Sequence, residues 1–138
     1  MSAKPKIVLF ACVHNAGRSQ MAAALFNHLA DPAVVRARSA GTEPANRVHP
    51  EVVAVMREMG IDLGDATPQR LTTELAEDAF MLVTMGCGEA CPVVPGVRRD
   101  DWPLSDPKGQ PLEVVRSIRD LLRERIEKLI RDEGWSRP

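Results

Sequence analysis

The fold is decided by residues 6–19, which read Lys6-Ile7-Val8-Leu9-Phe10-Ala11-Cys12-Val13-His14-Asn15-Ala16-Gly17-Arg18-Ser19. Residues 6–11 form a short continuous apolar run, which is typical of a strand buried inside a parallel sheet. Residues 12–18 are small, polar or glycine and predict a loop. From Ser19 onward the apolar residues follow helical spacing, which places one set on a single face: Met21, Ala22, Leu25, Phe26 and Leu29.

The same alternation of strands and helices continues along the chain. Further strands are predicted over 34–40 and 79–85, with a short one near 97–100. Helices are predicted to begin at Pro50 and at Thr72 or Thr73, and a long helix is predicted over 112–131. This order predicts a mostly parallel sheet with helices on both faces. We therefore expect one domain over residues 1–138, a three-layer α/β/α sandwich around a four-stranded, mostly parallel sheet. Ligands of such folds bind beyond the carboxyl ends of the strands.

The composition narrows the classes of function. Of 138 residues, 18 are basic and 19 acidic, so the net charge of −1 gives no basic excess for binding nucleic acid or an anionic membrane surface. No apolar run approaches the ~20 residues of a transmembrane helix, and no cleavable signal follows the polar start, so we expect a cytoplasmic location. Three cysteines are too few for a disulfide scaffold and are expected to be thiols there.

The loop after the first strand carries the strongest chemical pattern. Backbone N–H groups of a tight loop at a helix N-terminus converge into a cradle for a tetrahedral oxyanion. Cys12 lies where the helix dipole favours a thiolate nucleophile, Arg18 supplies a planar fork for two oxygens, and Ser19 is placed to donate a hydrogen bond to the sulfur. The expected oxyanion-binding residues are those of the loop and helix start, Val13, His14, Asn15, Ala16, Gly17, Arg18 and Ser19.

One asparagine and one glycine in the loop support this interpretation. Asn15 and Gly17 tolerate the left-handed backbone angles that such a curl needs. The alternative is a buried structural cysteine beside a chance arginine. His14 either helps to hold the thiolate or points to solvent, and His28 and His49 are expected to be ordinary surface or core residues.

Two other segments are candidates. Asp106-Pro107 is either a plain turn or a carboxyl group near the anion cradle that protonates an oxygen leaving group. Cys87 and Cys91 follow the strand over 79–85, so they lie at the same sheet edge as Cys12. They share one face if the segment is helical and can reach each other if it uncoils; a metal site or two idle thiols are the alternatives.

These motifs together resemble the low-molecular-weight protein tyrosine phosphatases, and more narrowly the arsenate reductases built on that fold. The resemblance covers nearly the whole chain. It rests on the Cys-x5-Arg-Ser loop with the following Gln20-Met21-Ala22, on Ser39-Ala40-Gly41-Thr42-Glu43-Pro44, on the thiol segment over 84–92, and on the later Asp106-Pro107.

The resemblance implies a mechanism. Cys12 would attack arsenic in bound arsenate, Asp106 would help a hydroxide leave as water, and Cys87 would attack the sulfur of Cys12 and release arsenite. Cys91 would then attack Cys87, leaving a Cys87–Cys91 disulfide for thioredoxin to reduce. The resemblance implies no metal and no tightly bound cofactor.

The sequence also departs from the family. The Val-His-Asn-Ala-Gly loop looks like an actinobacterial-type subgroup, some of whose members pass arsenate to mycothiol and use a mycoredoxin. An arsenate–mycothiol transferase, a tyrosine phosphatase and a non-enzymatic redox sensor are therefore the alternatives. Against a phosphatase, the chain has no tyrosine and places Lys108 after Asp106-Pro107, where phosphatases usually have an aromatic residue. Trp102 and Trp135 are the candidates to replace that aromatic wall.

Overall fold

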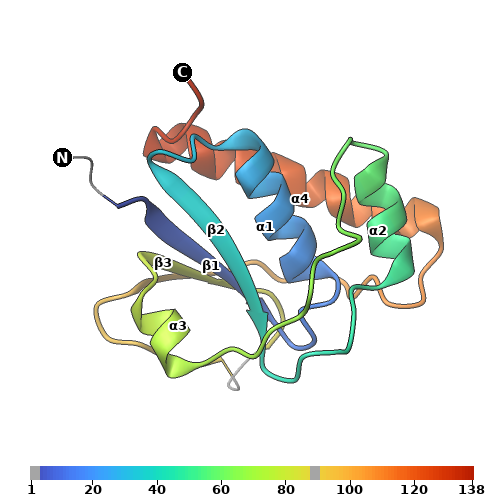
Figure 1. Ribbon diagram of the computed structural model, residues 1–138, viewed down its shortest axis with the longest axis horizontal. Coiled ribbons are helices and arrows are strands. Elements are labelled where there is room, and N and C mark those ends of the chain that lie inside the picture. The colour runs from blue at the N-terminus through green and yellow to red at the C-terminus, as the bar shows by residue number, and fades with distance from the viewer. Residues whose placement is uncertain (1–3, 88–90) are drawn as a thin grey trace.

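The computed structural model describes residues 4–87 and 91–138. The predicted order of elements is confirmed, with ends that shift by a few residues. In chain order the elements are β1 (Lys6–Cys12), α1 (Arg18–Leu29), β2 (Val35–Gly41), α2 (Pro50–Arg57), α3 (Thr73–Glu77), β3 (Met81–Thr84), β4 (Arg98–Asp101) and α4 (Leu112–Glu133) (Figure 1).

The strands form one sheet in the order β2-β1-β3-β4, and every pairing among them is parallel. Cys12 at the end of β1 pairs with Gly41 of β2, and the preceding Ala11 pairs with Thr84 of β3. The chain runs from β1 outward to β2 and then crosses back to β3, so the strand order switches beside β1. The loop after β1 therefore opens at the point where such sheets bind ligands.

The sheet is covered unequally on its two faces. Helices α1, α2 and α4 lie on one face, whereas the other face carries the five-residue α3 and the segment around Cys87 and Cys91 (Figure 1). Side chains of β1 alternate between the two apolar clusters, with Val8 and Phe10 in one and Leu9 in the other. All three are fully buried, and burial of each such side chain contributes about 1.5–3 kcal/mol, so β1 is anchored from both sides.

The helix ends follow the local sequence. Thr72 accepts a hydrogen bond from the Leu75 N–H at 3.2 Å and so caps α3, as the sequence predicts. Gly134 ends α4 with a left-handed backbone, φ 74°. The helices in the described part of the chain include none that is long and apolar enough to cross a membrane.

One surface cluster ties α2 to α4. Glu58, just after α2, receives hydrogen bonds from Nε and Nη2 of Arg116 at 2.9–3.0 Å and 2.7 Å, and from Nη1 of Arg119 at 2.8 Å. The hydrogen bonds from Arg116, and then those from Arg119, lower the pKa of Glu58 to about 2. The carboxylate is therefore charged at neutral and mildly acidic pH.

We expect Glu58→Gln to lower the free energy of unfolding near neutral pH. The folded-state pKa of about 2 lies below the usual 4.5, so the carboxylate stabilises the fold above pH 4.5 and loses that effect as the pH falls toward 2. Urea unfolding midpoints measured at about pH 7 and about pH 3.5 should differ less between the two proteins at the lower pH. Glu124→Gln, an exposed position on α4, is the control. A difference that stays constant with pH would contradict the assignment.

Candidate active site

The loop between β1 and α1 turns its N–H groups inward. The carbonyl oxygens of residues 12, 13, 14, 16 and 17 accept N–H groups from residues outside the loop: Thr42, Glu43, Ala45, His49 and Met21. The N–H and C=O of a trans peptide point in opposite directions, so the N–H groups of the next residues point to the other side. One of them, the Asn15 N–H, donates to Cys12 Sγ at 3.3 Å. Inward N–H groups at a helix N-terminus are an arrangement that can hold a tetrahedral oxyanion.

Cys12 lies at the base of this ring. Its Sγ accepts the Asn15 N–H at 3.3 Å and lies 2.8 Å from Ser19 Oγ. Ser19 Oγ itself accepts Asn15 Nδ2 at 2.8 Å, which leaves its own proton free to donate to the sulfur. All three residues are buried. Two hydrogen-bond donors are thus directed at one sulfur.

The expectation for the two turn residues is half right. Asn15 has φ 50°, in the left-handed region, but Gly17 has φ −139° and is not left-handed. Gly17 is needed for a different reason, because a Cβ there would lie 2.7 Å from Pro107 Cγ. This glycine therefore lets the Asp106-Pro107 segment approach the loop.

Three further residues, Gln20, Gln69 and Gly41, hold the loop, and none of them was assigned a role in the site from the sequence. The Oδ1 of Asn15 accepts Gln20 Nε2 at 3.2 Å and the Gln69 N–H at 2.9 Å, and Gln69 Nε2 donates to the Ser39 carbonyl at 2.8 Å. A Cβ on Gly41 would lie 2.6 Å from the Val13 oxygen and 2.8 Å from the Asn15 nitrogen. Gln20 and Gly41 were signalled in advance by their places in the two motifs that carry the resemblance, whereas Gln69 was not.

Arg18 is held in one orientation above the ring. Its Nη1 donates to the Leu104 carbonyl at 3.1 Å, and its Nη2 lies 3.9 Å from Asp106 Oδ2. Gly86 has φ 90°, and a Cβ there would lie 2.7 Å from Arg18 Nη1. The structure thus brings Arg18 and Asp106 together beside the loop. Asp106 also accepts the Lys108 N–H at 3.0 Å, so it forms a turn as well.

His14 and His49 lie near the loop and form hydrogen bonds with its surroundings. His14 Nδ1 lies 3.0 Å from the Glu43 carbonyl, so the half-buried ring is turned toward residue 43. His49 was expected to be an ordinary surface or core residue, but it lies against the loop. Its backbone N–H donates to the Ala16 carbonyl oxygen at 2.9 Å. Burial lowers its pKa below the usual 6.5, against the opposing effect of Glu51 and Asp106. His28 is exposed, as expected.

Cys87 and Cys91 form a disulfide, with their Cα atoms 5.6 Å apart, while Cys12 is free. Both cysteines are buried in the apolar cluster on the face of the sheet opposite to the cluster of Cys12. Cys87 Sγ lies 4.0 Å from the carbonyl oxygen of Ala11, next to Cys12 in sequence. The thiol pair and the anion site therefore lie on opposite sides of the end of β1.

In the described part of the chain, no aromatic side chain lines the site. Trp102 and Trp135, the candidates for an aromatic wall, are 3% and 4% exposed and pack in the core with Phe10 and Phe26, so that expectation was wrong. Phe80 stacks on Trp135, before the start of β3 and thus at the opposite edge of the sheet. Among residues 4–87 and 91–138, no three His, Cys, Asp or Glu side chains are grouped as metal ligands would be.

We expect Ser19→Ala to slow alkylation of Cys12 by iodoacetamide near neutral pH by about tenfold, because one hydrogen bond to a charged group is worth about 1.5–3 kcal/mol. The oxidised protein is used, since Cys87 and Cys91 are then blocked and Cys12 is the free thiol. Ser117→Ala, on the exposed side of α4, is the matched control. Equal rates for Ser19→Ala and wild type would show that the hydroxyl does not stabilise the thiolate.

Comparison with known proteins agrees with this geometry. A model of the low molecular weight phosphotyrosine protein phosphatase family matches residues 7–134. A putative arsenate reductase of Halobacterium salinarum is 42% identical over 126 residues, 87% of each chain, and a glutaredoxin arsenate reductase of Synechocystis is 38% identical over 128 residues, 91% of this chain and 96% of the other.

A solved structure, the thioredoxin-dependent arsenate reductase of Corynebacterium glutamicum, is similar over 96% of this chain, with 39% identity and a TM-score of 0.82. The match spans 63% of the Corynebacterium chain, so this chain corresponds to somewhat less than two thirds of that protein. The expected fold is confirmed by this similarity and by the parallel sheet. On the strength of the match over residues 7–134, the chain belongs to the low molecular weight phosphotyrosine protein phosphatase family.

Proposed function

We propose that the chain is an arsenate reductase that uses its own three cysteines in sequence and is reset by thioredoxin. The observation that carries the proposal is the Cys87–Cys91 disulfide at the same sheet edge as a free Cys12 in an oxyanion cradle. Hydrolysis of a phosphate ester requires one nucleophilic thiol, because phosphorus is not reduced. A second and third thiol beside the cradle have a purpose when the bound oxyanion accepts two electrons.

Arsenate is bound in the loop over residues 12–19. Arsenate has the tetrahedral shape and charge of phosphate, so inward N–H groups and the Arg18 guanidinium suit it equally well. Leu104, Asp106 and Gly86 fix the direction of Arg18 before the oxyanion arrives. The side-chain entropy of Arg18 is therefore lost on folding and not when the oxyanion binds.

The first chemical step is attack of the Cys12 thiolate on arsenic. An S–As bond forms, and a hydroxide leaves as water after it takes a proton from Asp106. Asp106 lies 3.9 Å from Arg18 and its side chain is 45% exposed, so it can exchange protons with solvent between turnovers.

The second step reduces arsenic. Cys87 attacks Sγ of Cys12, an S–S bond forms, and the S–As electron pair stays on arsenic, which leaves as arsenite. Cys91 then attacks Cys87, and Cys12 leaves as a thiolate into its own ring of donors. Two thiols are oxidised for each arsenate reduced. Thioredoxin, a dithiol protein, returns the two electrons to the Cys87–Cys91 disulfide.

The relay requires Cys87 to move. In the described structure its side chain lies in the cluster opposite to Cys12. Gly86 precedes Cys87, and a Cβ at Gly86 would lie 2.7 Å from Arg18 Nη1, so the start of the thiol segment passes close to Arg18. The φ of 90° at this glycine is one that residues with a side chain rarely adopt.

The other functions considered have weaker support. A phosphotyrosine phosphatase lacks an aromatic wall here, since all five aromatic residues lie elsewhere. Transfer of arsenate to a low-molecular-weight thiol such as mycothiol, with a mycoredoxin as reductant, would leave the internal disulfide without a purpose. Weak hydrolysis of small phosphate esters is expected as a side activity of the same cradle.

We expect arsenate-dependent NADPH consumption with thioredoxin and thioredoxin reductase to be steady for the wild type and absent for Cys12→Ser. Cys87→Ser should also lose turnover but keep hydrolysis of para-nitrophenyl phosphate, because it lacks only the reductive step. Cys91→Ser should stop after one turnover, and mass spectrometry should then find a Cys12–Cys87 disulfide.

The outcomes separate the parts of the proposal. Reduction of arsenate by Cys12→Ser would contradict the assignment of the nucleophile. Undiminished turnover by Cys87→Ser would remove the internal relay and favour an external thiol. Several turnovers by Cys91→Ser, with no trapped disulfide, would remove Cys91 from the sequence of steps.

A further inference from the structure

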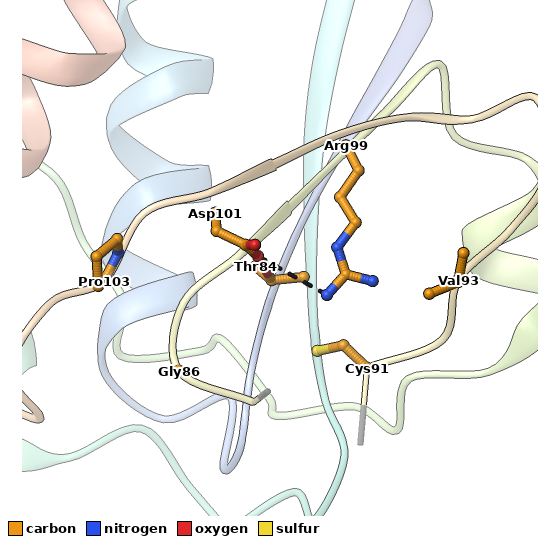
Figure 2. Close-up of a pocket in the computed structure, with 7 residues that line it drawn as sticks. All are labelled: Thr84, Gly86, Cys91, Val93, Arg99, Asp101 and Pro103. Carbon is orange, nitrogen blue, oxygen red and sulfur yellow. Dashed lines mark ion pairs between the residues drawn. The ribbon is translucent and has the colours of Figure 1, made fainter. Parts of the chain in front are cut away.

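A hollow of about 620 Å³ lies beside the disulfide, between the end of β3, strand β4 and the segment after Cys91. Figure 2 shows its lining, to which Cys91, Thr84, Val93, Arg99 and Asp101 contribute. Val93 at its rim is 81% exposed, so the hollow is open to solvent. The proposed roles of the loop, Arg18 and Asp106 do not use any of these β4 side chains.

Arg99 places a positive charge in this hollow. Its Nη1 donates to the carbonyl oxygen of Pro92, the residue after Cys91, at 3.2 Å. Its Nη2 lies 3.7 Å from Asp101 Oδ1, and the guanidinium extends toward Cys91 in Figure 2. The Arg99 side chain is 27% exposed and that of Asp101 is 68% exposed, so the cation is the more sheltered member of the pair.

We propose that Arg99 is a positioning residue of the relay, which stabilises the Cys91 thiolate and holds the chain next to it while Cys91 attacks the Cys12–Cys87 disulfide. This inference rests on the proposed function. The hydrogen bond from Arg99 to the Pro92 carbonyl oxygen holds the backbone next to Cys91. The guanidinium in the same hollow stabilises the negative charge of the Cys91 thiolate.

The step is balanced without any external reagent. The Cys91 thiol first loses its proton to solvent, and its thiolate attacks Cys87 Sγ. The Cys91–Cys87 bond forms, the Cys87–Cys12 bond breaks, and Cys12 leaves with the electron pair. An ordinary thiol is mostly protonated near neutral pH, so a nearby cation increases the reactive fraction.

Among the described residues that line the hollow, Arg99 is the cation. Asp101, also from β4, opposes it, whereas Thr84 and Gly86 on the β3 side carry no charge. The side chains of β1, β2, β3 and α3 in the cluster behind Cys91 are apolar. Arg18 contacts Gly86 but is held by Leu104 and Asp106 at the anion site. Removal of Asp101 should therefore act in the opposite direction to removal of Arg99.

The test follows the exchange step directly. Fully reduced enzyme is mixed with arsenate without a reductant, quenched by alkylation at intervals, and analysed for Cys12–Cys87 and Cys87–Cys91 by mass spectrometry. We expect Arg99→Gln to convert the first disulfide into the second roughly tenfold more slowly near pH 7, and to recover near pH 9, where the thiol ionises without help. Arg99→Lys should keep most of the wild-type rate.

The matched variants separate charge from structure. Asp101→Asn should convert the disulfide as fast as wild type or faster, whereas a purely structural Arg99–Asp101 pair would make both variants slow. Arg98→Gln, which breaks the ion pair of the preceding residue with Glu133, is the control and should behave as wild type. Formation of Cys12–Cys87 should keep its rate in every variant.

Two results would overturn this inference. They are a wild-type rate in Arg99→Gln near pH 7, or a slow rate in both Arg99→Gln and Asp101→Asn that does not recover near pH 9. Failure of wild type to form any Cys87–Cys91 after arsenate is a different result. It would overturn the proposed relay itself.

Discussion

The inward direction of the peptide N–H groups after β1 is the constraint on which the site depends. Five loop carbonyls are bound by N–H groups of neighbouring segments, so the amides have no other direction to point. This ring requires a central parallel strand that ends at Cys12, a left-handed Asn15, and Gly41 on β2 to let the loop pass. A Cβ at Gly41 would touch backbone atoms, which cannot move aside without opening the ring.

The end of β1 also divides the chemistry between the two faces of the sheet. Cys12 packs with the side chains that face α1 and α4, and the Cys87–Cys91 pair packs with those that face α3. This second face is covered by one short helix and loops, so it buries less apolar area than the first face does. In return Cys91 lines an open hollow instead of lying beneath a long helix.

Residues 6–19 alone predicted the strand, the loop and the helix, because burial of a central strand and helical spacing are local patterns. The positions of Arg18 and Ser19 followed from where the helix begins. Gln69 could not be found in this way, because its N–H reaches Asn15 across 54 positions of sequence. From the sequence, Gly17 was expected to supply a left-handed backbone angle. The structure shows instead that Gly17 leaves room for Pro107, a contact that depends on tertiary packing. The thiol pairing stayed open because Cys87 and Cys91 meet only if the segment uncoils.

The same cradle serves a phosphatase and a reductase because tetrahedral oxyanions of phosphorus and arsenic present similar oxygens to it. What separates the two chemistries lies outside the loop. An aromatic wall would select an aryl ester, and here the tryptophans are used in the core instead. Attack of Cys87 on the sulfur of Cys12 leaves two electrons on arsenic, whereas phosphorus in a phosphoenzyme cannot accept them. The thiol pair, rather than the anion site, therefore determines which reaction this member of the family performs.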